Sequence, residues 1–181
     1  WSSDVCSSDL GTTGARGTST SSGAAGAATL RNADTRARLL RELWAALNET
    51  PFAESMYAAD REGNYVQARR VPFLSTRVVE RSGAVAAEII EKRDTRFKVT
   101  ERMVGPTQFD PRTRPWFTGA ETEARIYWSP LFASTTSDSL SVASSFFVPG
   151  ADGTPDLVFA STIPLRRLTE FVQVHPPSQN G

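Results

Sequence analysis

Six short segments that combine β-branched residues with charged or polar ones limit the choice of fold most strongly. Three follow one another between residues 74 and 104, as LSTRVVER, AAEIIEKR and FKVTERMV, and three lie further along, as RIYWSPLF, LSVASSFFV and DLVFASTI. This mixture is typical of strands that have one face in the core and the other in water, as in antiparallel sheets. We therefore predict an antiparallel sheet that makes up most of one domain.

Polar turns connect the predicted strands. Residues 60–64, DREGN, separate two further strand-like stretches within MYAADREGNYVQARR, and Gly63 can supply the positive φ that a tight turn needs. Residues 149–155, PGADGTP, combine Pro, Gly and Asp between the last two strand-like segments and predict another turn. Hairpins are therefore the expected connections.

An amphipathic helix is predicted before the first hairpin. In LRNADTRARLLRELWAALNETP, apolar residues recur at spacings of four and three, at Ala33, Ala37, Leu40, Trp44 and Leu47. This spacing gives one apolar stripe along a helix. Asn32 or Asp34 is placed to cap its start, and Pro51 marks a stop after its end.

Two shorter helices complete the predicted architecture. One starts near Pro115 and the other, PLRRLTEFV, starts at Pro164, because proline suits the first position of a helix. The second helix would place Leu165, Leu168 and Val172 on one face. The fold class is therefore α+β, with a long N-terminal helix, an antiparallel sheet, a short helix in the middle of the chain and a C-terminal helix.

The first 29 residues are expected to contribute nothing to this domain. Residues 1–10, WSSDVCSSDL, resemble one reading frame of a common sequencing-library adapter and are set aside as an artefact; the alternative is a natural Ser/Asp-rich tail. Residues 11–29 are Gly, Ala, Ser and Thr except for Arg16. Such a stretch buries too little apolar surface to order itself, so it is interpreted as a flexible segment or a frame-shifted end.

Residue content argues against several function classes. The single cysteine, Cys6, lies in residues 1–10, so the predicted domain lacks disulfides, cysteine zinc sites and thiol nucleophiles. The single histidine, His175, lies near two prolines at the end of the chain, which argues against Ser-His catalysis. Without Asp4 and Asp9, 18 acidic residues face 20 basic ones, a formal net charge of about +2. We expect no enzyme, metal, cofactor or nucleic-acid partner for this chain.

The most specific stretch is FDPRTRPWFTGA, residues 109–120. Its prolines predict a sharp turn followed by a short helix, which would hold Arg114 and Trp116 close together. A guanidinium presents a planar fork of donors for a carboxylate or phosphate, and an indole offers an apolar wall with one N–H donor. The alternative is structural: Arg114 paired with Asp110 or a backbone carbonyl, beside a core tryptophan.

FDPRTRPWF resembles the YDPRTRPWY element of double Cache sensor domains, the extracytoplasmic ligand-binding modules of bacterial chemoreceptors, histidine kinases and nucleotide cyclases. Three further segments are similar to other parts of the same domains and occur in the same order: MYAADREGNYVQARR, YWSPLFASTTSDSLSVASSFFV and DLVFASTIPLRRLTEFV. The resemblance implies a membrane-distal, PAS-like module at residues 30–172, with a ligand pocket on the concave side of a curved sheet. Residues 173–181 would then begin the linker to a membrane-proximal module in a membrane-anchored receptor.

In the amino-acid-binding branch of that family, the Arg and Trp of the motif hold the ligand carboxylate, while tyrosines and two acidic residues receive its ammonium. Arg114 and Trp116 match the first pair. The other positions depart from the pattern, as Phe109, Phe117, Phe132, Ser134 and Thr162. Because a buried ammonium without a carboxylate partner is costly, this resemblance implies that amino acids are not bound in the family's usual way.

The resulting hypothesis is an extracytoplasmic sensor of a small carboxylate or other anion. Its predicted ligand contacts are Arg114 and Trp116, an apolar remainder, and the two positions where acidic residues are replaced: Phe109, Phe117, Trp128, Phe132, Ser134 and Thr162. The alternative is a module without a pocket that acts in dimerisation. Its homodimer surface would be the helix face that carries Leu40, Trp44 and Leu47.

Overall fold

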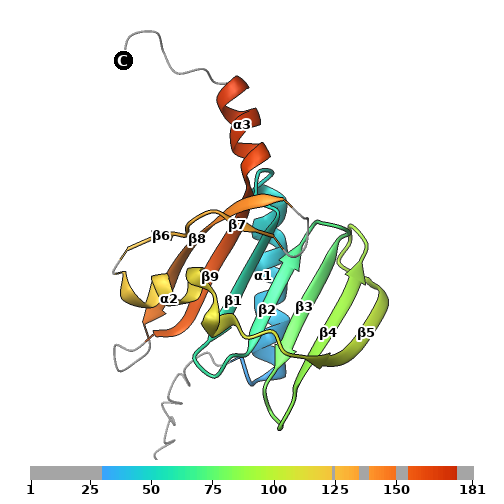
Figure 1. The fold of residues 1–181 in the computed structure, drawn as a ribbon. Helices are drawn as coiled ribbons and strands as arrows, with labels where there is room; N and C mark the ends of the chain where they lie inside the picture. The colour runs from blue at the N-terminus through green and yellow to red at the C-terminus, as the bar shows by residue number, and fades with distance from the viewer. Residues whose placement is uncertain (1–29, 124, 135–138, 150–154, 175–181) are drawn as a thin grey trace, which may run out of the picture.

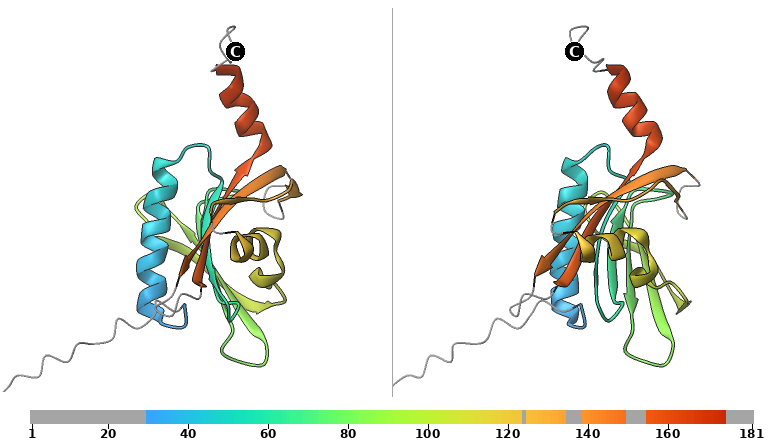
Figure 2. Two further views of the ribbon diagram at one scale, coloured as in Figure 1. Left: turned by 90° about the vertical axis from the view of Figure 1, so that its left-hand side faces the viewer. Right: turned by 60° about the vertical axis from the view of Figure 1, so that its left-hand side comes forward.

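One antiparallel sheet separates two layers of helix, as Figure 2 shows edge-on. The structure is a computed structural model that describes residues 30–123, 125–134, 139–149 and 155–174. Within these residues nine strands run in the order β5-β4-β3-β2-β1-β9-β8-β6, with β7 also paired to β8. The first strand thus lies beside the last one, in the middle of the sheet (Figure 1). The predicted α+β class and antiparallel sheet are confirmed.

The strands follow the predicted segments closely. Their bounds are β1 (Ser55–Asp60), β2 (Tyr65–Arg69), β3 (Ser75–Glu80), β4 (Ala86–Arg93), β5 (Val99–Thr107), β6 (Tyr127–Trp128), β7 (Phe132–Ala133), β8 (Leu140–Pro149) and β9 (Pro155–Pro164). The segment RIYWSPLF, expected to be one strand, forms two strands of two residues each, both paired with β8. Pro130 lies between them, and a proline has no N–H to donate to a sheet ladder.

The first hairpin is organised by a buried carboxylate. Asp60 accepts hydrogen bonds from the backbone N–H of Glu62 (3.0 Å), from the backbone N–H of Asn64 (2.9 Å) and from the Asn64 side-chain amide (2.8 Å). Burial raises the pKa of Asp60, although these hydrogen bonds act in the opposite direction. Gly63 has a φ of 86°, which confirms its predicted place in the turn.

Replacement of Gly63 by alanine is expected to lower the free energy of unfolding by about 1–2 kcal/mol. A side chain at this φ is strained, and the added Cβ would lie 2.7 Å from the Arg81 side chain. Urea denaturation measures the change. The matched control is Gly83→Ala, because the nearest atom to its added Cβ is 3.9 Å away, and we expect that variant to stay within about 0.5 kcal/mol of wild type. Equal losses in the two variants would contradict the assignment of the strain to Gly63.

Helix α1 (Ala33–Glu49) covers one face of the sheet (Figure 2). Asn32 caps it, because its side-chain oxygen accepts from the backbone N–H of Asp34 (2.8 Å) and of Thr35 (3.1 Å). The buried residues of the helix are Leu39, Leu40, Leu43, Trp44 and Leu47. Ala33 and Ala37, predicted to belong to the stripe, are exposed, because the helix lies on the sheet through its leucines.

The buried face of α1 cannot serve as a dimer surface while the domain is folded. Leu40, Trp44 and Leu47 belong to a core cluster with residues of the central strands such as Ala58 and Val66. Their side chains are 6 %, 6 % and 1 % exposed. The hypothesis that these three residues form a homodimer interface is therefore wrong, because the sheet already covers them.

The opposite face of the sheet carries the short helices. The 3₁₀ helix η1 (Pro111–Thr113) leads into α2 (Pro115–Thr122), which starts at the predicted proline. The Ser145 hydroxyl on β8 donates to the Trp116 backbone carbonyl (2.7 Å) and attaches α2 to the sheet. Because strand residues alternate between faces, the core has a second cluster here, which includes Tyr57, Tyr65, Trp116 and Phe117.

The C-terminal helix α3 (Leu165–Val174) follows β9 directly and extends beyond the end of the sheet (Figure 1). Leu165 is exposed. Leu168 and Val172 were predicted to lie on the same face of the helix, but their side chains are not among those that the structure describes. No helix within the described residues is both long and apolar enough to cross a bilayer. The predictions for residues 1–29 and His175 fall outside the described residues, as do residues 150–154 of the predicted turn and residues 175–181 of the predicted linker, whereas residues 173 and 174 belong to α3.

Candidate ligand-binding site

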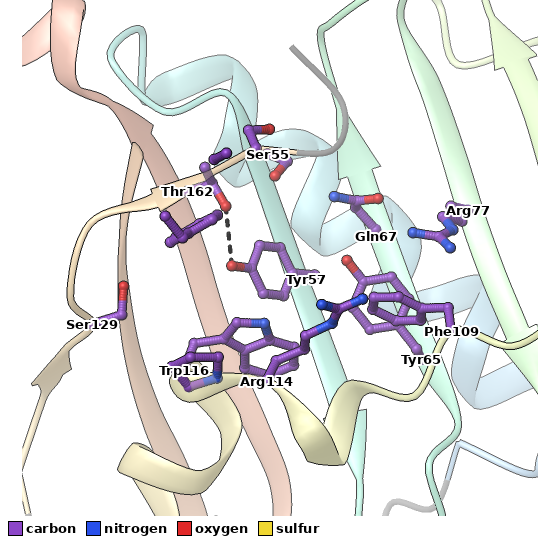
Figure 3. A pocket seen from close by; sticks show the side chains of 14 residues that line it. Ser55, Tyr57, Tyr65, Gln67, Arg77, Phe109, Arg114, Trp116, Ser129 and Thr162 are labelled. Carbon is purple, nitrogen blue, oxygen red and sulfur yellow. Dashed lines mark hydrogen bonds between the residues drawn. The ribbon is translucent and has the colours of Figure 1, made fainter. Parts of the chain in front are cut away.

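A cavity of about 150 Å³ lies between the sheet and the turn that precedes α2 (Figure 3). Its lining comes from the first three strands, the turn of the motif, the region of β6 and β7, and the last strand. The lining residues are Ser55, Tyr57, Tyr65, Gln67, Arg77, Phe109, Arg114, Pro115, Trp116, Ser129, Phe132, Ala133, Ser134 and Thr162.

The floor of the cavity is a row of side chains on adjacent strands. Tyr57 on β1 lies opposite Gln67 on β2, and Gln67 lies opposite Arg77 on β3. Ser55 lies opposite Thr162 on β9 in the neighbouring row. Since residues two apart on a strand share a face, the sheet register alone brings these five side chains to one surface.

Arg114 lines the cavity and occupies a backbone position that is unusual for a charged residue of its length. It occupies the N-cap position of α2, yet its side chain makes no capping hydrogen bond. Its guanidinium lies 5.1 Å from the centre of the Phe109 ring. Its Nε is buried and has no hydrogen-bond partner among the described residues, which is a costly state for a donor.

The carboxylate of Asp110 is not the partner of Arg114. Arg112 binds both of its oxygens, at distances of 2.7–3.2 Å, and Arg81 approaches it at 3.8 Å. The hydrogen bond from Arg112 is the main reason that the pKa of Asp110 is lowered. The structural alternative in which Asp110 neutralises Arg114 is therefore not the arrangement of this domain.

A second guanidinium, that of Arg77, faces the cavity but is already neutralised. It forms an ion pair with Glu88 on β4, and it lies 4.3 Å from the centre of the same Phe109 ring. No Asp or Glu occurs among the described residues that line the cavity. Counting Glu88 against Arg77, the side chains of the described lining carry one unbalanced positive charge, that of Arg114.

Two tyrosines supply hydroxyls that the sequence analysis did not anticipate. The Tyr57 hydroxyl and the Thr162 hydroxyl are 3.0 Å apart (Figure 3). Burial raises the pKa of both Tyr57 and Tyr65, so both are neutral phenols at neutral pH. The Tyr57 ring packs edge-on against Trp116, with ring centres 4.8 Å apart.

The sequence of the first hairpin contains a signal for three cavity residues that were not predicted, Tyr57, Tyr65 and Gln67. In MYAADREGNYVQARR, strict alternation on the two strands puts Tyr57, Tyr65 and Gln67 on the face opposite Ala58 and Val66. Had the small apolar residues been assigned to the face under the helix, the tyrosines and the glutamine would have been assigned to the pocket.

Six of the eight residues predicted as ligand contacts line the cavity. They are Phe109, Arg114, Trp116, Phe132, Ser134 and Thr162. The cavity lining does not include Phe117, which is 2 % exposed and packs in the core, with its ring centre 5.7 Å from that of Trp116. Nor does it include Trp128, which is 57 % exposed; its neighbour Ser129 faces the cavity instead. Ligand contact at the six residues stays a prediction.

One carboxylate reaches the site indirectly. The Ser134 hydroxyl donates to Oε1 of Glu54 at 3.4 Å, and Glu54 is 4 % exposed. Its other oxygen is buried without a hydrogen-bond partner among the described residues. Groups of three or more His, Cys, Asp or Glu side chains able to hold a metal ion are absent from the described part of the chain.

The domain therefore combines a helix on one face of an antiparallel sheet with a small cavity at the other face. No protein-family model and no curated protein matches the sequence. Among solved structures, the sensory domain of the Campylobacter jejuni chemoreceptor Tlp3 matches with a TM-score of 0.55 and 15 % identity, over 78 % of this chain and 46 % of that chain. The ligand-binding domain of the Pseudomonas fluorescens chemoreceptor CtaA, in complex with L-valine, matches with a TM-score of 0.51 and 18 % identity, over 81 % and 50 %.

The chain thus has the fold of the ligand-binding domains of bacterial chemoreceptors, as expected from its resemblance to double Cache domains. It spans about half the length of the solved domains that it matches. Structures of the two chemoreceptor domains contain L-valine, L-isoleucine or L-alanine. At this level of identity the likeness concerns the fold.

Proposed function

We propose that this chain is an extracytoplasmic small-molecule-sensing domain of a membrane-anchored bacterial receptor, and that its ligand is a small monocarboxylate held by Arg114 against Trp116. The observation that carries the proposal is the buried, unpartnered Nε of Arg114 at a cavity whose described lining has no acidic side chain. The chemoreceptor fold supports the sensing role.

Charge favours an anion at this position. A guanidinium forms its strongest hydrogen bonds with carboxylates, often two at a time. In a partly buried site, the ligand charge also balances the one unbalanced charge of the lining, since Arg77 is neutralised by Glu88. Phe109 and Phe132 leave apolar surface for a short hydrocarbon chain.

An ammonium ion has a weaker basis for binding here. The Ser134 hydroxyl in the lining is hydrogen-bonded to the carboxylate of Glu54, but Glu54 itself does not line the cavity. A cation in the cavity would also face the guanidinium of Arg114. Amino acids, which the two chemoreceptors contain in their structures, are therefore not the favoured class for this chain.

A sensor must couple its ligand to a change elsewhere in the receptor. A ligand shifts such an equilibrium only by its difference in affinity for the two states. The cavity touches β1 and β9, and β9 continues directly into α3, which leaves the domain (Figure 1). This connection supports a path from the ligand toward the rest of a receptor.

The test is a thermal-shift series on the chain with three molecules of nearly equal shape: 3-methylbutanoate, 3-methylbutanamide and 3-methylbutylamine. We expect only the carboxylate to raise the melting temperature, because only it carries the negative charge that pairs with Arg114. At about 100 times its Kd, a bound ligand adds about 2.7 kcal/mol to the free energy of unfolding. A shift from the amine instead would refute the anion site and favour ammonium binding at Glu54. No shift from any small carboxylate would favour a domain without a ligand.

A further inference from the structure

A second buried group of the cavity is left without a hydrogen-bond partner, besides that of Arg114. Gln67 lines the cavity and is 6 % exposed. Its side-chain carbonyl oxygen is buried and has no partner among the described residues. Figure 3 shows the Gln67 amide between the side chains of Tyr57 and Arg77 on the cavity floor.

We infer that this domain recognises a short hydroxymonocarboxylate, whose carboxylate binds Arg114 and whose hydroxyl group binds the amide of Gln67. The inference rests on the proposed function and specifies the ligand class of the same site. On this inference, Gln67 is the residue that makes the site prefer a hydroxy acid to an amino acid or an unsubstituted acid.

The amide of Gln67 can pair with a hydroxyl in either of its two orientations. A glutamine side chain presents an acceptor at one end and donors at the other, and the two ends exchange places when the amide turns over. A hydroxyl can donate and accept, so it pairs with Gln67 in either orientation. An ammonium only donates, and it therefore pairs with one orientation alone.

Charge separates the two groups further. Gln67 lies opposite Arg77 in the sheet, and Arg114 lines the same cavity. With Glu88 paired to Arg77, a single carboxylate already balances the charge of the site. An added ammonium would place a third cationic group near the guanidiniums of Arg77 and Arg114, whereas a hydroxyl adds no charge.

Cavity size limits the length of the acid. A protein cavity of about 150 Å³ accommodates a molecule of the size of benzene, which is comparable with the volume of the present cavity. Acids of three to five carbon atoms are in this range. The lining offers polar side chains, such as those of Tyr57, Gln67 and Thr162, together with the rings of Phe109 and Phe132, which suits a molecule with a hydroxyl and a short alkyl group.

The test compares matched ligands by calorimetric titration of the chain. Each set contains a hydroxy acid, its parent acid and its amino acid: lactate, propanoate and alanine, then 3-hydroxybutanoate, butanoate and 3-aminobutanoate. In at least one set, the hydroxy acid is expected to bind about 10-fold more tightly than the other two, the effect of one hydrogen bond in a buried site.

Replacement of Gln67 by leucine removes the amide and keeps a side chain of similar size. In this variant the hydroxy acid is expected to lose its tenfold advantage, while the affinity for the parent acid stays within about threefold. The control is Gln108→Leu, the same change at an exposed position outside the cavity lining, which should leave the tenfold preference in place.

The possible results separate the two proposals. Parent acid and hydroxy acid of equal affinity in the unaltered chain would overturn the role of Gln67 and leave the anion site standing. The same holds if the amino acid binds most tightly through its carboxylate. If none of the carboxylates binds, both the proposed function and this inference fail. The comparison in the unaltered chain decides these cases even if Gln67→Leu does not fold.

Discussion

Replacement of Arg114 by serine is expected to weaken the binding of a carboxylate ligand about 100-fold or more, without destabilising the unliganded domain. Removal of one member of a buried charged pair costs about 2–5 kcal/mol of binding free energy. Serine is among the best N-cap residues and Arg114 makes no capping bond, so the substitution adds a cap worth about 0.5–1 kcal/mol. This gain offsets the lost contact with the Phe109 ring.

The measurement pairs calorimetric titration of the carboxylate with urea denaturation of the unliganded chain. Arg112→Ser is the control, because Arg112 lies two residues away in the same turn, is exposed and binds Asp110. We expect that variant to bind the ligand as wild type does. A loss of more than about 1 kcal/mol of stability in Arg114→Ser, with affinity retained, would show that Arg114 is a structural residue and would refute the anion site.

The small expected change in stability follows because the residue that suits a helix start differs from the residue that suits an anion site. A position before a helix is best filled by a short polar residue that accepts from the first turn of N–H groups. This chain has an arginine there, and its buried Nε donor has no hydrogen-bond partner within the described ranges. Such departures from local consistency concentrate at functional sites, which is why the turn at residues 109–116 is the most informative stretch of the sequence.

The order of strands and helices along the chain could be predicted from the sequence because local signals determine it. Alternating β-branched and charged residues, DREGN with Gly63, and Pro115 each act over a few residues. The break between β6 and β7 was missed although Pro130 signalled it, since a run of apolar residues around it resembled one strand. The apolar stripe of α1 was shifted because Ala33 and Ala37 fit the helical period but lie beyond the sheet contact.

The site could be predicted only in part because it depends on which strands become neighbours. Arg114 and Trp116 were identified from one motif, since both lie in one turn. Tyr57, Gln67 and Arg77 come together through the register of three strands, which no local pattern specifies. The replacement of motif tyrosines by phenylalanines therefore suggested a cavity without tyrosine hydroxyls, whereas Tyr57 and Tyr65 of the first hairpin supply two.

Replacement of Trp44 by alanine is the second change for which we expect a large effect, a loss of about 3–5 kcal/mol in the free energy of unfolding. The Trp44 ring is 6 % exposed, packs edge-on against Phe97 with ring centres 5.2 Å apart, and belongs to the cluster that attaches α1 to the sheet. Since a whole domain is stable by about 5–15 kcal/mol, this loss removes a large share of the total. Urea denaturation gives the change, with the exposed Glu42→Ala on the same helix as the control, expected within about 0.5 kcal/mol of wild type.

The same variant separates a core residue from a dimer contact. If Trp44 packs on the sheet, Trp44→Ala lowers the stability by the same amount at every protein concentration, and the molar mass of the folded chain in analytical ultracentrifugation does not change. A residue of a dimer interface would behave differently: its replacement would lower the molar mass, and the stability of the unaltered chain would rise with concentration. That second pattern would contradict the placement of α1 against the sheet, because Trp44 cannot be covered by β1 and β2 and by a partner at once.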